Sequence, residues 1–156
     1  MIKLSRVTDY AIVLLAHLAG CGEGSTHNAR ELAEKTGLPA PMVSRVLKSL
    51  TREGLLRSHR GSKGGYSLAR SPDEISVPEI ITALEGPIAL TECAVHPGSC
   101  RQETNCDVRE PWQRINQVVR NALSDITLAD LAGSEIPGSI VPLHSLGVDT
   151  SDLVEG

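Results

Sequence analysis

The sequence predicts a mainly α-helical fold with one small β-hairpin, and three observations support this prediction. Apolar residues recur at steps of three and four over several segments, which is the period of amphipathic helices. Two short segments flank the glycine-rich stretch 60–64 and predict a hairpin. A short helix, a glycine-containing turn and a second amphipathic helix precede that hairpin. This order is typical of a winged helix-turn-helix, and here a long helix follows it.

The first three expected helices cover residues 8–20, 28–36 and 41–53. We expect Thr8 to cap the first helix, which is apolar nearly all round and must therefore be covered by tertiary packing. Asn28 and Glu31 resemble a capping box at the start of the second helix. Pro41 suits the first position of the third. Four apolar residues share one face of this third helix: Val43, Val46, Leu47 and Leu50.

The rest of the chain contains the hairpin, two further helices and one long irregular segment. We expect residues 55–59 to pair with residues 65–69, and a helix led by Pro78 at 77–85. The longest helical pattern covers residues 110–131. Its apolar stripe consists of Trp112, Ile115, Val119, Ala122 and Ile126.

These elements divide the chain into four parts. Residues 1–85 form the winged helix-turn-helix, and residues 110–132 form the long helix. The segment 86–109 has no clear period, and such long segments in compact domains are usually functional or disordered. Residues 133–156 contain several prolines, glycines and serines, so we expect a mobile tail.

Charge separates the two halves of the chain. The net charge is −4, yet residues 1–70 carry 11 Lys and Arg against 5 Asp and Glu, and residues 71–156 carry 4 against 14. A basic first half suggests a module that binds a polyanion, joined to a part with another role. The apolar run 11–19 directly follows Asp9 and is too short to span a bilayer. We therefore expect a cytoplasmic protein without a membrane segment.

The predicted third helix and the hairpin are rich in cations. Six Lys and Arg fall within residues 45–63. In a helix-turn-helix the second helix enters the major groove, where side chains near its N-terminal end reach base edges. The plain alternative is a helical hairpin with a solvated charged face. We expect double-stranded DNA as the partner, contacted by Met42, Ser44, Arg45, Lys48, Arg52, Arg60 and Lys63.

Three of the four cysteines lie close together in sequence. Six residues separate Cys93 from Cys100 and five separate Cys100 from Cys106, which is the spacing of neither zinc ribbons nor ferredoxins. In a reducing compartment, such thiols favour metal or redox chemistry over structural disulfides. Thiolates suit iron–sulfur clusters, zinc and Cu(I). Unligated thiols and a thiol–disulfide switch also stay open, and Cys21 is expected to be a bystander.

Together these features resemble a family of winged-helix regulators that includes IscR, NsrR and RirA. The resemblance covers residues 1–132, and its most specific part is the hairpin sequence RGSKGGY at 60–66. The opening 4–10, the sequence AEKTGL at 33–38 and the three-cysteine segment also match. Within the family, the chain is most similar to regulators of the SUF cluster-assembly system.

The resemblance implies a homodimer joined through the long helix, a palindromic operator, and an iron–sulfur cluster, [2Fe-2S] or [4Fe-4S], on the three cysteines. IscR-like proteins take a fourth ligand from a histidine three residues after the last cysteine, but here that position is Arg109, which cannot bind iron. NsrR-like proteins use an aspartate near the start of the first helix of the other subunit. Asp9 occupies the matching place, so we expect it to be the fourth ligand. A simple helix N-terminal charge would also explain Asp9, and His96, Asp107 or an external ligand are the alternatives.

The sequence therefore predicts a DNA-binding transcription regulator, a repressor of cluster assembly or of a related stress response, and not an enzyme. No nucleophile–base pair or phosphate-binding loop stands out, and four of the histidines are scattered: His17, His27, His59 and His144. Three alternatives stay open. They are a nitric-oxide- or iron-responsive regulator of the same fold, a thiol or zinc redox sensor, and an iron–sulfur carrier whose basic half binds a protein.

Overall fold

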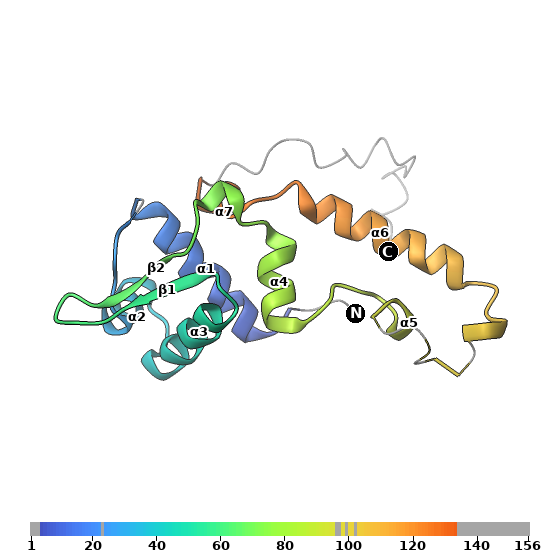
Figure 1. Ribbon diagram of the computed structural model, residues 1–156, viewed down its shortest axis with the longest axis horizontal. Coiled ribbons are helices and arrows are strands. Elements are labelled where there is room, and N and C mark those ends of the chain that lie inside the picture. The colour runs from blue at the N-terminus through green and yellow to red at the C-terminus, as the bar shows by residue number, and fades with distance from the viewer. Residues whose placement is uncertain (1–3, 23, 96–97, 99, 102, 134–156) are drawn as a thin grey trace, which may run out of the picture.

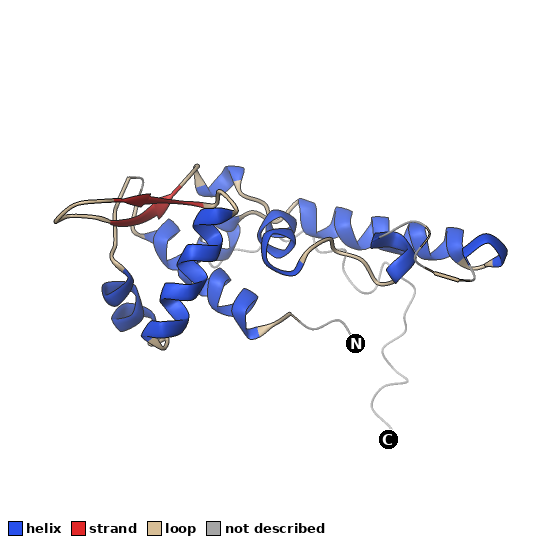
Figure 2. Ribbon diagram, turned by 60° about the horizontal axis from the view of Figure 1, so that its bottom comes forward, coloured by secondary structure: helices blue, strands red, loops and turns tan. Residues whose placement is uncertain are grey.

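The computed structural model describes residues 4–22, 24–95, 98, 100–101 and 103–133. A helical body carries a two-stranded hairpin at one end, and a long helix runs out from the other end (Figures 1 and 2). The predicted fold class, mainly α with one small hairpin, is confirmed. Within these described ranges, no helix is both long and apolar enough to cross a membrane.

The first helix, α1 (Arg6–Gly20), begins after Ser5, whose hydroxyl oxygen accepts a hydrogen bond from the backbone N–H of Thr8 at 3.3 Å. The prediction that Thr8 caps this helix is wrong. Thr8 lies inside the first turn and is fully buried, and its hydroxyl donates to the carboxylate of Glu85. Ser and Thr are both good caps by type, so the distant contact with Glu85 decides which residue takes the role.

Helix α1 runs through the centre of the helical body. Its buried apolar residues, Ala11, Leu14, Leu15 and Leu18, are at most 2% exposed. It packs against α2 (Ala29–Thr36), α3 (Ala40–Arg52), α4 (Val77–Glu85) and α7 (Leu128–Gly133). The buried apolar core is entirely aliphatic, as expected for a chain without phenylalanine.

Helices α2 and α3 form the helix-turn-helix. The side chain of Asn28 accepts a hydrogen bond from the backbone N–H of Glu31 at 2.9 Å, which caps α2 as predicted. Gly37 ends α2 in the left-handed conformation, with φ of 69°. The predicted apolar face of α3 is confirmed, because its four residues are all fully buried: Val43, Val46, Leu47 and Leu50.

The hairpin pairs β1 (Leu56–His59) with β2 (Gly65–Leu68) in antiparallel register, with His59 opposite Gly65. His27, just before α2, joins this sheet through two backbone hydrogen bonds with Tyr66, of 3.0 and 2.8 Å. Gly65 makes this approach possible, because a Cβ atom there would lie 2.5 Å from the carbonyl oxygen of His27. The hairpin is thereby attached to the start of α2.

The single long helix predicted over 110–131 is broken into two. Helix α6 (Arg109–Ser124) ends at Asp125, and α7 begins after Thr127. The side chain of Asp130 accepts from the backbone N–H of Thr127 at 2.7 Å, and the hydroxyl of Thr127 accepts from the N–H of Asp130 at 3.3 Å. This reciprocal cap starts a new helix. Backbone hydrogen bonds from Val77 to Ile126 and from Leu128 to Ile75 fasten the break to the body.

The segment between α4 and α6 contains a short helix, α5 (Glu92–Val95), and a 3₁₀ turn (Glu103–Asn105). Helix α5 packs against α6. Asn116, the buried residue of α6, accepts a hydrogen bond through its side-chain oxygen from the backbone N–H of Leu90 at 2.7 Å. Asn116 thus holds the start of this segment against α6. The expected mobile tail lies outside the described residues beyond Gly133.

Replacing Asn116 with alanine should lower the free energy of unfolding by about 1–3 kcal/mol, because the N–H of Leu90 would lose its acceptor. Urea denaturation measures this change. Asn121→Ala is the matched control, since Asn121 is exposed on the same helix and both substitutions raise helix propensity equally. Equal stability of the two variants would contradict the proposed role of Asn116.

Candidate functional site

The predicted DNA-contacting residues lie on α3 and on the hairpin tip. Arg45 and Lys48 are exposed on α3. Ser44 is half-buried, and Met42 is half-buried because it packs against the core. Arg60 and Lys63 are exposed in the tip, which a backbone hydrogen bond from Gly64 to Gly61 closes at 3.0 Å. Both elements lie at the end of the molecule that is remote from the far end of α6 (Figures 1 and 2).

The cations differ in whether a neighbouring carboxylate already binds them. Arg52 forms an ion pair with Glu53 at 3.0 Å. In the part of the chain that the structure describes, four others have no carboxylate oxygen within 4 Å: Arg45, Lys48, Arg60 and Lys63. Such unneutralised charge on an exposed helix and a hairpin tip suits contact with phosphates.

The three-cysteine segment presents thiols of different exposure. Cys93, on α5, and Cys106, just before α6, are half-buried, whereas Cys100 is exposed. None of the four cysteines is in a disulfide. Among the described residues, no three His, Cys, Asp or Glu side chains are close enough together to hold a metal ion. The donor chemistry therefore fits an iron–sulfur cluster, but the described conformation does not bring the thiols together.

The start of the cysteine segment is linked directly to the start of α1. Glu85, the last residue of α4, accepts hydrogen bonds from the backbone N–H of Ser5 at 2.9 Å and from the hydroxyl of Thr8. Hydrogen bonds from the side chain of Ser5, then from the side chain of Thr8 and from the backbone N–H of Ser5, hold the pKa of Glu85 below its usual value. Asp9, the expected fourth ligand, is exposed in the same first turn of α1. Ser5 and Glu85 are 80 residues apart in the chain, and no pattern in the sequence indicates that they are in contact.

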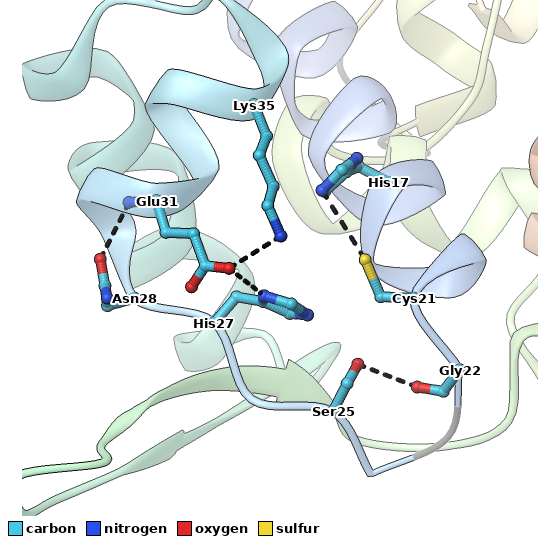
Figure 3. Close-up of polar contacts among 8 residues, drawn as sticks. All are labelled: His17, Cys21, Gly22, Ser25, His27, Asn28, Glu31 and Lys35. Atoms are coloured by element: carbon cyan, nitrogen blue, oxygen red, sulfur yellow. Dashed lines mark hydrogen bonds and ion pairs between the residues drawn. The ribbon is translucent and has the colours of Figure 1, made fainter.

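A second polar cluster, which the sequence interpretation missed, lies at the other end of α1 (Figure 3). Nε2 of His17 is 3.7 Å from the sulfur of Cys21, and Nδ1 of His27 is 2.9 Å from the carboxylate of Glu31. The ammonium of Lys35 is 2.8 Å from the same carboxylate oxygen. The spacing of four residues between His17 and Cys21 at a helix end could have indicated that these two side chains lie close together. The approach of His27 depends on tertiary structure.

Glu31 holds this cluster together electrostatically. Hydrogen bonds from Lys35 and then from His27 lower the pKa of Glu31 from 4.5 to about 2. The same hydrogen bond with Glu31 is the main cause of a raised pKa for Lys35. Glu31 therefore remains a carboxylate well below neutral pH.

The helix-turn-helix, the hairpin joined to it and their exposed cations define a winged-helix DNA-binding protein. The sequence profile of one family, Rrf2, described as "Iron-dependent Transcriptional regulator", matches residues 4–134. The chain belongs to this Rrf2 family of transcriptional regulators.

Individual relatives agree with this assignment. The transcriptional regulator CymR of Bacillus subtilis is 34% identical over 131 residues, which are 83% of this chain and 89% of CymR. The solved structure of CymR, "the Global Cysteine Regulator of B. subtilis", has a TM-score of 0.68 at 30% identity and covers 87% of this chain and 100% of that one. The structure of T. potens IscR has a TM-score of 0.65 at 26% identity and covers 93% of this chain and 96% of that one. The chain is thus a DNA-binding transcriptional regulator and not an enzyme, as predicted.

The pH dependence of stability should reveal the ionised state of Glu31. A carboxylate whose pKa is lower in the folded protein contributes stability that is fully present above pH 4.5 and is lost as the pH falls toward 2. Glu31→Gln lacks this contribution. The thermal midpoint of the unsubstituted protein should therefore exceed that of Glu31→Gln above pH 4.5, and this difference should shrink as the pH falls toward 2. Circular dichroism melts check this. Glu34→Gln is the control, since Glu34 pairs with exposed Arg30; a difference for Glu31→Gln that stays constant with pH would contradict the prediction.

Charge removal at the candidate DNA interface should give two different results. Lys63→Ala should weaken binding to all DNA sequences alike and reduce the salt slope of log K by about 1, as expected for a phosphate contact. Arg45→Ala should cost about 1–3 kcal/mol and relax sequence preference, as expected for a base contact. Fluorescence anisotropy at several salt concentrations measures both.

Arg114→Ala, which removes an exposed cation from α6, is the control for total charge. If Arg114→Ala weakened binding as much as Lys63→Ala, the effect would come from net charge and the assignment of the interface would be wrong.

Proposed function

We propose that this regulator is a homodimer that represses genes of iron–sulfur cluster assembly, or of a related stress response, by binding a palindromic operator while it carries an iron–sulfur cluster. The proposed ligands are Cys93, Cys100 and Cys106 of one subunit and Asp9 of a second copy. The observation that carries the proposal is the placement of three reduced thiols on a segment that starts at the hydrogen-bonded junction of Glu85 with α1. The cytoplasm is the expected site of action.

An unburied apolar stripe on α6 supports the homodimer. Trp112, Ile115 and Val118 are 39%, 44% and 66% exposed, although their periodicity is that of a packed helix. A helix face of this kind is typically covered by a partner. A second copy packed along α6 would fix the separation of two DNA-binding heads, which a palindromic operator requires at a spacing of one helical turn, about 34 Å.

The junction at Glu85 supports a coupling between the cysteine segment and DNA binding. The segment leaves α4 directly after Glu85, and Glu85 is bonded to Ser5 and Thr8 at the start of α1. Helix α1 in turn packs against α3, which carries the candidate base contacts. A cluster bound to the segment of one subunit and to Asp9 of the second copy would restrain the segment in one subunit and the start of α1 in the other. Thiolates supply the ligands that iron–sulfur clusters need.

The same fold with a thiol or zinc sensor in place of a cluster is the second candidate. The described conformation favours the thiol sensor, because the three thiols are free and do not converge on one centre that could bind a metal. Anaerobically purified protein separates the two, because a cluster gives visible absorbance and acid-labile sulfide whereas zinc or bare thiols give neither.

Serine substitutions test the ligand set and the function together. Cys93→Ser, Cys100→Ser and Cys106→Ser should each abolish bound iron and sulfide and derepress a reporter placed behind the upstream DNA of this gene. Asp9→Ala should retain iron but shorten the lifetime of the cluster. Cys21→Ser is the matched control for the ligand set and should retain bound iron and sulfide, because Cys21 lies outside the cysteine segment. Repression that persists in all three cysteine variants would overturn the dependence on a cluster.

A further inference from the structure

We propose that His17, Cys21 and His27 form a zinc site, separate from the cysteine segment, that fastens the end of α1 to the hairpin. The residues come from the last turn of α1, its C-cap and the strand-like residue before α2. A thiolate and two imidazoles are ligands that Zn²⁺ prefers, and three protein ligands leave a fourth position for water.

Two of the three donors are already close together. Nε2 of His17 lies 3.7 Å from the sulfur of Cys21, which is near the separation of two donors bound to one zinc ion. Figure 3 shows the side chains of both residues directed into the space that His27 faces from the other side. Both are half-buried, so the pair is shielded but reachable from solvent.

The third donor is oriented for metal binding by Glu31. Because Nδ1 of His27 is bonded to the carboxylate at 2.9 Å, Nδ1 carries the proton in a neutral imidazole and Nε2 carries the lone pair. The side chain of His27 is 12% exposed, and its Nε2 atom is buried with no hydrogen-bond partner among the described residues. A carboxylate behind a histidine is the usual outer partner of a zinc ligand, and a buried lone pair without a partner is costly.

The site needs a small movement to close. The ring centroids of His17 and His27 are 6.4 Å apart, whereas two imidazoles on one tetrahedral zinc place them on the order of 5 Å apart. Within the described residues no complete three-ligand group is formed, so rotation of the two rings toward Cys21 must accompany binding. Zinc would bond to Nε2 of each histidine and to the sulfur of Cys21, whose proton passes to solvent.

Lys35 is the positive charge that faces this site. Its ammonium is bound to Glu31 at 2.8 Å, so the carboxylate largely offsets its repulsion of a cation.

Zinc in this position would act on the DNA-binding surface. The backbone of His27 is bonded in both directions to Tyr66 of β2, so a ligand bond to His27 also restrains the hairpin. The hairpin tip carries Arg60 and Lys63. Zinc occupancy should thus hold the hairpin relative to α1 independently of any cluster.

Metal titration of the full chain tests the site, with Cys93, Cys100 and Cys106 replaced by serine to remove the other thiols. This variant should bind one equivalent of Zn²⁺. With Co²⁺ as the probe, it should show sulfur-to-metal charge transfer and intense tetrahedral d–d bands. Adding Cys21→Ser or His27→Asn should weaken Zn²⁺ binding at least tenfold, whereas His59→Asn, a histidine of β1, should leave it unchanged. Equal Zn²⁺ affinity with and without Cys21, or cobalt spectra without charge transfer, would overturn the proposal.

Glu31→Gln provides a test that does not remove a ligand. Loss of an outer carboxylate should weaken Zn²⁺ binding about 10- to 100-fold without loss of the folded circular dichroism spectrum, whereas Glu34→Gln should have no effect. Unchanged affinity in Glu31→Gln would contradict the assigned role of this carboxylate. Because these titrations need neither DNA nor a cluster, their outcome is independent of the proposed function.

Discussion

Burial of α1 is the constraint on which the rest of the structure depends. The chain has no phenylalanine and one tryptophan, so its core must be assembled from many aliphatic side chains. Leu14, Leu15 and Leu18 are almost fully buried because α2, α3, α4 and α7 all pack around the same helix. Each leucine contributes about 1.5–3 kcal/mol by burial. Helix α1 is thereby in direct contact with α3, which carries the candidate DNA contacts Arg45 and Lys48.

Both ends of α1 hold polar groups that the core alone does not require. At the start, Ser5 and Thr8 bind Glu85, from which the cysteine segment departs. At the end, His17 and Cys21 face His27, which is bonded to the hairpin. One buried helix thus connects the two proposed metal sites, at the cysteine segment and at His17, Cys21 and His27, with the elements that carry the candidate DNA contacts. This arrangement is suited to a regulator whose DNA affinity depends on what those residues bind.

Much of the fold could be predicted from the sequence because its signals are local. The helix 77–85 and the apolar face of α3 follow from periodicity and capping, and the hairpin follows from its glycines. The break between α6 and α7 is hidden by the apolar pattern, which continues through Ile126, although Thr127 and Asp130 have the local spacing of a capping pair. The backbone bonds of Ile126 and Leu128 with Val77 and Ile75, which fasten the break, join residues distant in the chain. The candidate site could also be predicted only in part. The clustered cations and the cysteine spacing are visible in the sequence, whereas the contacts of Glu85, Asn116 and His27 join residues distant in the chain.

Operator affinity of the same protein with and without its cluster tests the central claim most directly. The measurement is a titration of upstream DNA under anaerobic conditions, at one salt concentration, with reconstituted protein and with protein from which iron has been removed. The account predicts at least tenfold tighter binding by the loaded protein, equivalent to about 1.4 kcal/mol. Equal affinity of the two forms for the same DNA would contradict it.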